Sequence, residues 1–189
     1  AVQCALAATG ALDGTVIVTY GDVPLLRGET LVALATEHAR AGNAVTVLTA
    51  NVDDPTGYGR ITRGADRAVT AIVEHRDADA KTRELNEINT GVYAFDGALL
   101  GQLLGRLSAS NSQGELYLTD VVQLAAAAGR PVGSVVAEDA AETEGVNDRV
   151  QLAEMAARLR ARLVRDAQLS GVTVHDPATP YAAAGVLAS

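Results

Sequence analysis

Cysteine and aromatic residues are scarce in this chain of 189 residues, and tryptophan is absent. Cys4 is the only cysteine, so the chain can form neither an internal disulfide bond nor a zinc site built from cysteines. The aromatic fraction is 3%, so the hydrophobic core must be built mainly from Ala, Val and Leu. A single cysteine is compatible with a reducing compartment, and we expect the protein in the cytoplasm.

Positive charge and long apolar runs are lacking as well. The formal net charge is −8, whereas binding along a nucleic-acid backbone requires a basic stripe, so nucleic acid is not expected as a partner. No stretch reaches the roughly 18 apolar residues that a membrane helix needs, and the N-terminal residues lack a signal-peptide pattern. An acidic protein can still bind a phosphorylated small molecule when a metal ion bridges the like charges.

Apolar and β-branched residues are spaced as in an α/β protein with one large domain. Residues 15–19 have the continuous β-branched character of a strand covered on both faces, and residues 44–49 predict another buried strand. Residues 29–41 between them have helical periodicity, ending at Gly42 as the cap. This order predicts a right-handed crossover between parallel strands. Helices are also predicted at 1–9, 97–107 and 117–128, and a strand at 132–137.

The middle of the chain has a different character. Residues 57–63, 68–75 and 88–95 are extended segments, which predicts an antiparallel or mixed part of the sheet, with an exposed loop or short helix before the last segment. Residues 148–169 predict a long amphipathic helix. Its apolar stripe comprises Leu152, Met155, Ala156, Leu159 and Leu163. Residues 171–179 predict a strand followed by a turn.

Asp22 stands at the end of the first predicted buried strand, in the segment "TYGDVPLL". Ligands of open α/β sheets bind beyond the carboxyl ends of parallel strands. Gly21 allows an unusual backbone angle or a close approach by a ligand, and Pro24 stiffens the exit from the strand. Asp22 is therefore a candidate ligand of Mg²⁺, which accepts one or two carboxylates together with substrate phosphates. The structural alternative is that Asp22 caps the turn before the next helix.

Five further motifs follow in order: "GYGRI", "IVEH", "INTGVYAF", "ELYLTD" and "EGVNDRVQLAE". With "YGDVPLL", the series resembles the N-terminal uridyltransferase domain of the bifunctional GlmU family, over nearly the whole chain to about Thr179. The resemblance implies an α/β fold with a mixed, mostly parallel sheet of the nucleotidyltransferase (Rossmann-like) type, incomplete at its N-terminal side, and a C-terminal linker helix.

The resemblance also implies a reaction. Members of this family transfer UMP from UTP to N-acetylglucosamine-1-phosphate, which gives pyrophosphate and UDP-N-acetylglucosamine, a precursor of the cell wall. In the family, the Asp of the Gly-Asp pair and the Asn of "GVN" hold Mg²⁺. These positions are Asp22 and Asn147 here. No protein nucleophile is required, because phosphoryl-type transfer depends on positioning and charge neutralisation.

The remaining site residues are matched motif by motif. Tyr20 and Gly21 match the segment that lines the nucleotide and sugar site, and Gly59, Glu74 and Asn89 match residues that bind the amino sugar. An ionised Glu accepts hydrogen bonds and an Asn both donates and accepts, so the pair can orient sugar hydroxyls. A glycine amide at position 59 lets the sugar approach without a side chain in the way.

Each of these residues has a structural alternative. Glu74 could be an exposed acid at a strand end, Asn89 could bond only to backbone, and Asn147 could be the N-cap of the long helix. Tyr117 and Thr119 also lie near the sugar phosphate in the family, although helix packing would explain them. The three histidines are predicted to be surface or packing residues: His38, His75 and His175.

The chain departs from the family at both ends. The glycine-rich loop that cradles the triphosphate is expected upstream of Ala1, so we expect this chain alone to be inactive. We divide the chain into a partial uridyltransferase domain (1–147), a linker helix (148–170) and the remnant before a left-handed β-helix domain (171–189). The acetyltransferase of that absent domain, and the homotrimer that it forms in the family, are expected only of a parent protein.

Two other functions are compatible with these residues. One is nucleotidyl transfer to another sugar phosphate such as glucose-1-phosphate, because the loop that reads the base is not in this chain. The other is a non-catalytic module that binds a sugar phosphate or a partner. A dinucleotide-dependent dehydrogenase is disfavoured, since no G-x-G-x-x-G follows a strand.

Overall fold

The structure is a computed structural model that describes residues 1–10, 12–109 and 111–178. The chain divides into two compact units. The first consists of Ala1–Gly21 and Leu26–Thr143, and the second of Asp22–Leu25 and Glu144–Ser189. Among the described residues, no helix combines the length and the apolar character that a membrane crossing demands.

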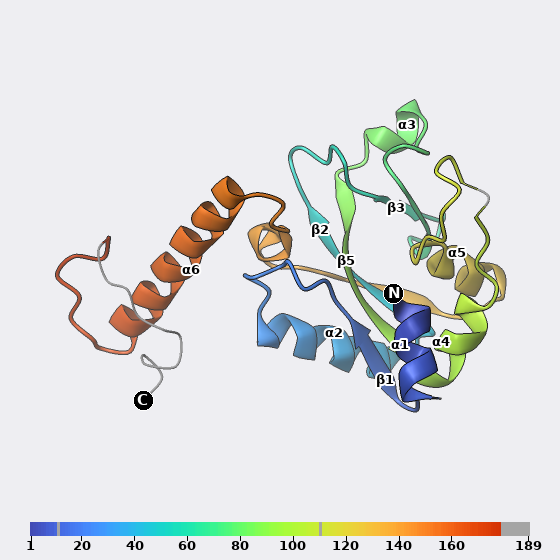
Figure 1. The fold of residues 1–189 in the computed structure, drawn as a ribbon, viewed down its shortest axis with the longest axis horizontal. Coiled ribbons are helices and arrows are strands. Elements are labelled where there is room, and N and C mark those ends of the chain that lie inside the picture. The colour runs from blue at the N-terminus through green and yellow to red at the C-terminus, as the bar shows by residue number, and fades with distance from the viewer. Residues whose placement is uncertain (11, 110, 179–189) are drawn as a thin grey trace. The chain divides into compact units, whose positions relative to one another are not determined.

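The first unit alternates helices and strands along most of its length (Figure 1). Its helices are α1 (Val2–Thr9), α2 (Gly28–Ala41), α3 (Ala80–Arg83), α4 (Gly97–Leu104), α5 (Asp120–Ala127) and the 3-10 helix η1 (Ala140–Thr143). Its strands are β1 (Thr15–Val18), β2 (Val45–Asn51), β3 (Arg60–Arg63), β4 (Val69–Val73), β5 (Glu87–Asp96) and β6 (Val132–Val136). Apart from η1, which was not predicted, these elements match the predicted segments in order and type.

Strand β5 organises the sheet, whose order is β4-β3-β5-β2-β6 with β1 also paired to β5. Between described strands, β2 and β6 form the one parallel pair, and the other four pairings are antiparallel. Because β1 and β2 are both antiparallel to β5, they run parallel to each other without being neighbours. The α/β class with a mixed sheet is confirmed. The predicted predominance of parallel pairing is corrected, because β5 separates the two strands of the crossover.

Helices cover both faces of the sheet, so the hydrophobic core has two parts (Figure 1). Alternate residues of β2 and β5 point to opposite faces. Val47 and Phe95 pack with side chains of α4 and α5, whereas Leu48 and Ala94 pack with Leu34 of α2. Strand β1 is only half buried, contrary to prediction, because a strand that pairs on one side within the described part of the chain is less enclosed.

Helix α2 shows how the local sequence sets the boundary of an element. It ends at Gly42, which has the left-handed φ of 61° and donates its N–H to carbonyls of the last turn, as predicted. His38 is buried one turn earlier, with its Nδ1 3.0 Å from the Thr46 hydroxyl. Burial lowers the pKa of His38, and Asp96 partly opposes this. His38 is therefore a neutral packing residue, in agreement with its predicted role.

The second unit is built on α6 (Arg149–Leu169). Met155 is buried as predicted, and Leu159 and Leu163 are half-buried. Leu152 and Ala156 are exposed, whereas Val164 and Ala167 are buried, so the apolar stripe agrees with the predicted one only in part. Residues 171–178 form no strand, and Thr179 and residues 180–189 lie outside the described part.

Candidate active site

A bulge in β5 shapes the central part of the candidate site. Between the pairs Val47↔Tyr93 and Thr49↔Asn89, β2 advances by one intervening residue and β5 by three, so β5 carries extra residues there. Gly91 lies in the bulge with a φ of +80°, a backbone conformation that residues other than glycine rarely adopt. The backbone conformation therefore requires the glycine of the motif "INTG".

Asn89 begins the bulge and is held by backbone on two sides. Its N–H donates to the Gly59 carbonyl at 2.9 Å, and its Oδ1 accepts the Gly91 N–H at 3.0 Å. The structure thus brings Gly59 and Asn89 together, as the motif assignment requires. The predicted structural alternative for Asn89 is also partly present, because one side-chain atom is used by the backbone.

Tyr93 is buried in the core and interacts with the Asn89 side chain. Its hydroxyl makes no hydrogen bond within the described residues, and the Asn89 side chain lowers the pKa that burial raises. Burial has the larger effect, so the pKa of Tyr93 is raised and the phenol stays neutral.

Glu74 follows the last residue of β4 and is half buried. Thr119 is 5% exposed and donates its hydroxyl to Glu74 Oε1 at 3.0 Å. A Cβ atom added to Gly59 would lie 2.9 Å from the Ile72 side chain and 3.4 Å from Glu74 Oε2. The glycine therefore lets the two strands pack closely and leaves the Glu74 carboxylate next to the peptide at position 59.

Tyr20 completes this group from the segment after β1. A Cβ at position 91 would be 1.8 Å from Tyr20 Cε2, so the phenol ring lies directly over the glycine of the bulge. Tyr20 and Glu74, with Tyr117 and Thr119, line one cavity of about 440 Å³. Burial, and then the carboxylates of Asp77 and Glu115, raise the pKa of Tyr117, so its hydroxyl stays protonated and can donate.

Gly21 has a more limited role than predicted. Its φ lies outside the left-handed region, and a Cβ there would meet no described atom within 4 Å. The suggestion of an unusual backbone angle is therefore wrong, because neither the backbone conformation nor neighbouring atoms demand glycine. Close approach of a ligand stays a prediction for this position.

The predicted metal ligands, Asp22 and Asn147, both belong to the second unit. The backbone connects them closely, since Val146 donates its N–H to the Asp22 carbonyl at 2.9 Å. Within the described residues, the Asp22 carboxylate and the Asn147 amide group make no hydrogen bond or ion pair. The N-cap of α6 is Asp148, which accepts from Gln151 at 2.8 Å, so capping does not account for Asn147. Capping does not account for Asp22 either, because α2 begins after Arg27.

Helix α6 also holds the segments that carry these two residues. Arg162 donates to the Leu25 carbonyl at 3.0 Å, and Arg158 pairs with Glu144 at 2.9 Å. The two arginines are four residues apart and thus on one face of the helix. Sequence reasoning missed both, because an arginine off the apolar stripe carries no sign of its distant partner.

Arg60 was missed for a similar reason. It is 1% exposed, donates to the Tyr58 carbonyl and lies 3.4 Å from His75 Nδ1. Its guanidinium thus joins the residue before Gly59 to the residue after Glu74. His75 is a packing partner of this arginine, and His175 is exposed, as predicted for both.

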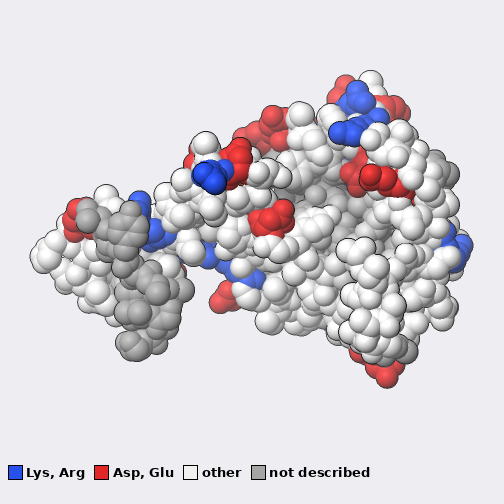
Figure 2. Space-filling model, viewed as in Figure 1, with Lys and Arg blue, Asp and Glu red and all other residues white. Residues whose placement is uncertain are grey.

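Two features of the surface lie apart from these residues. A cavity of about 860 Å³ between α1 and α4 contains none of the predicted site residues. On the face shown in Figure 2, acidic and basic side chains lie in small separate groups on an otherwise uncharged surface. That face therefore carries no extended patch of positive or negative charge.

The fold is that of a nucleotidyltransferase. It is similar to the solved structure of a Bacillus anthracis protein assigned to glucose-1-phosphate thymidylyltransferases, with a TM-score of 0.57 and 18% identity, over 93% of this chain and 62% of that one. The model of the family described as "Nucleotidyl transferase" matches residues 1–147. The chain therefore belongs to the nucleotidyl transferase family.

Proteins of similar sequence show which members of the nucleotidyl transferase family this chain resembles. The chain is 54% identical over 181 residues to the bifunctional protein GlmU of Corynebacterium efficiens, and 59% identical over 173 residues to that of Streptomyces coelicolor. These matches cover 96% and 91% of this chain but 37% and 36% of the relatives. The chain thus spans somewhat more than a third of the length of these relatives, and the resemblance to the GlmU family is confirmed.

Proposed function

We propose that this chain supplies the sugar-phosphate side and the metal ligands of an enzyme that transfers UMP from UTP to N-acetylglucosamine-1-phosphate. The products are UDP-N-acetylglucosamine and pyrophosphate. The observation that carries the proposal is the identity of 54–59% to GlmU proteins over nearly the whole chain. The cytoplasm as the site of the reaction and a homotrimeric parent are part of the same proposal.

The contacts of Glu74, which lines the cavity, and of Asn89, which does not, support the sugar side of this proposal. Glu74 already accepts the Thr119 hydroxyl with one oxygen, which fixes the carboxylate and leaves its other oxygen for a sugar hydroxyl or amide. Asn89 is fixed by two backbone hydrogen bonds through Gly59 and Gly91. Fixed acceptors and donors lose little freedom on binding, which favours recognition of one orientation of the sugar.

The metal side is supported by the chemistry of the donors. Family membership points to a divalent cation, and Mg²⁺ in particular is our proposal. Asp22 and Asn147 offer a carboxylate and an amide oxygen, which are hard ligands of the type that Mg²⁺ prefers. Two protein ligands are too few for a closed cage, as is usual for an Mg²⁺ that also binds water and substrate phosphates. Bound there, the cation would neutralise charge at the α-phosphate of UTP.

The residues of the chain then act by positioning. A phosphate oxygen of the sugar phosphate attacks the α-phosphorus of UTP, the new P–O bond replaces the bond to the β-phosphate, and pyrophosphate leaves. No proton has to be removed from an ionised phosphate, so no general base is needed. Glu74, Asn89 and Tyr20 orient the sugar, and the attacking oxygen is thereby placed in line.

Pyrophosphate release tests this function directly. The full-length protein that carries this chain should release pyrophosphate from UTP in the presence of N-acetylglucosamine-1-phosphate and Mg²⁺. Glucose-1-phosphate, and dTTP in place of UTP, are the comparison substrates. Faster turnover with either would assign the chain to a different nucleotidyl transfer, and saturable sugar-phosphate binding without turnover of any pair would establish the non-catalytic module.

Glu74→Ala should mainly weaken sugar-phosphate binding. The substitution removes a half-buried acceptor and leaves the Thr119 hydroxyl without its partner, so we expect a loss of about 1–3 kcal/mol in binding. The KM for N-acetylglucosamine-1-phosphate should rise by roughly 5- to 150-fold, with a smaller change in the KM for UTP.

Glu84→Ala is the matched control, because Glu84 is an exposed glutamate at the end of α3. Asn89→Ala should act in the same direction as Glu74→Ala. A KM for the sugar phosphate that stays at the control value in Glu74→Ala would remove Glu74 from the site.

A further inference from the structure

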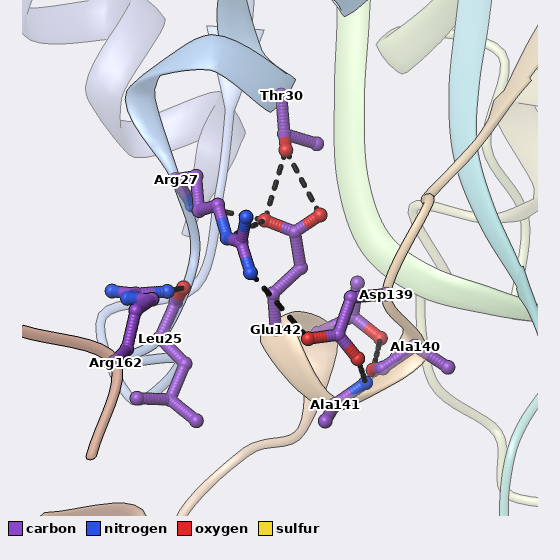
Figure 3. A network of polar contacts seen from close by, with 9 residues as sticks. Leu25, Arg27, Thr30, Asp139, Ala140, Ala141, Glu142 and Arg162 are labelled. Carbon is purple, nitrogen blue, oxygen red and sulfur yellow. Dashed lines mark hydrogen bonds and ion pairs between the residues drawn. The ribbon is translucent and has the colours of Figure 1, made fainter. Parts of the chain in front are cut away.

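Glu142 is a buried carboxylate that none of the motifs explains. It lies in η1, is 2% exposed, and receives hydrogen bonds from two groups at the start of α2 (Figure 3). The Thr30 hydroxyl is 2.9 and 2.8 Å from its two oxygens, and the Arg27 backbone N–H is 3.2 Å away. The Arg27 guanidinium lies further off, at 3.9 Å, and also reaches Asp139 at 3.6 Å.

The location at a helix N-terminus explains why a buried carboxylate is tolerated there. Arg27 is the N-cap of α2 and makes no side-chain cap hydrogen bond of its own. A carboxylate at this end accepts N–H groups that the helix leaves unpaired and interacts favourably with the helix dipole. Glu142 thus caps α2 from a position 115 residues away in sequence.

The same contact joins two particular places in the chain. Arg27 comes two residues after Asp22–Leu25, and Glu142 comes two residues before Glu144, where the second unit resumes. The carboxylate therefore holds together the two points at which the chain leaves and re-enters the first unit. Inside the second unit, the corresponding segments are joined by the hydrogen bond from Val146 to Asp22.

We propose that Glu142 is a positioning residue for the metal ligands: it fixes the spacing of the two segments that carry Asp22 and Asn147. The inference rests on the proposed function, which assigns those two residues to the cation. Two segments that are already fixed do not lose conformational freedom when a cation binds, so the cation is bound more tightly. Groups that hydrogen-bond metal ligands directly change metal affinity by about 10- to 100-fold, and Glu142, which acts through the backbone, is expected at the lower end of this range.

Glu142→Gln and Thr30→Val test this inference in the full-length protein. The first keeps the shape of the side chain but loses the charge, and the second replaces the donor hydroxyl with a methyl group. Glu138→Gln is the matched control, since it removes the same charge from an exposed residue of the same segment. Mn²⁺ is the probe, titrated by electron paramagnetic resonance with and without UTP. Exchange of the Val146 amide hydrogen is followed in the metal-free protein.

We expect both variants to bind Mn²⁺ roughly tenfold more weakly than the control and to exchange the Val146 amide faster. Saturating metal should restore kcat, because Glu142 touches no substrate. If capping of α2 were its entire role, thermal stability would fall while Mn²⁺ affinity stayed at the control value, and the inference would be overturned. If the wild-type protein binds no Mn²⁺ even in the presence of UTP, the proposed metal role of Asp22 and Asn147 fails instead. Should Glu142→Gln not fold, Thr30→Val decides alone.

Discussion

Asp22→Ala is expected to abolish metal-dependent transfer in the full-length protein. Two phosphorylated substrates must meet at the active site, and loss of a metal ligand leaves their charges uncompensated. We expect a decrease in kcat/KM on the order of 10³-fold or more, since a metal acting as a Lewis acid contributes several kcal/mol. The hydrogen bond from Val146 uses the Asp22 backbone carbonyl, so the substitution leaves that connection intact. Pyrophosphate release at a series of Mg²⁺ concentrations measures the effect.

Two further variants test whether this loss of activity is specific to the proposed metal ligands. Asn147→Ala should produce nearly the same loss, because it removes the second proposed ligand. Asp53→Ala should have little effect, because Asp53 is an exposed carboxylate outside the candidate site. Normal turnover of Asp22→Ala at saturating Mg²⁺ would remove Asp22 from the metal site.

The order and type of the elements could be predicted from the sequence, but the pairing of the strands could not. Runs such as "TVIVT" and "AVTVLT" identify strands because β-branched residues fit a pleated, buried surface. They contain no information on which strand lies beside which. The ten-residue strand β5 occupies the place between β1 and β2, and this follows from packing across the whole sheet.

For the segment "GVTVH", the sequence predicted a strand that the structure does not contain. Its alternating valines have strand character, yet residues 171–178 adopt no strand. A strand gains its stability from a neighbour, through ladder hydrogen bonds and cross-strand contacts. Residues 171–178 pair with none of the described strands, so local propensity alone was insufficient.

The candidate site was predictable to the extent that its residues belong to short motifs. Gly59, Glu74 and Asn89 are far apart in sequence, and the structure brings them together at the ends of β3, β4 and the bulge of β5. Contacts that depend on partners more than a hundred residues away carry no local signal. Glu142 and Arg162 are of this kind, and neither residue type is rare on an exposed helix.

Gly91→Ala is expected to impair both stability and sugar binding, by two separable effects. The left-handed φ of +80° costs an alanine about 1–2 kcal/mol, which should lower Tm by roughly 2–8 °C. The new methyl group would also overlap the Tyr20 ring at 1.8 Å. Tyr20 is 57% exposed, so its ring can move toward solvent, and the cavity would lose that part of its wall. The KM for N-acetylglucosamine-1-phosphate should therefore rise.

Two control variants separate the strain from the overlap. Gly42→Ala places an alanine at a φ of +61° where the new Cβ meets no described atom within 4 Å, so it should lower Tm and leave KM unchanged. Tyr20→Ala should raise KM with little effect on the backbone. In the double variant, Gly91→Ala should add its stability cost but no further increase in KM, because the ring that it displaces is already absent. Independent, additive increases in KM from the two substitutions would show that Gly91 affects the sugar by a route other than Tyr20.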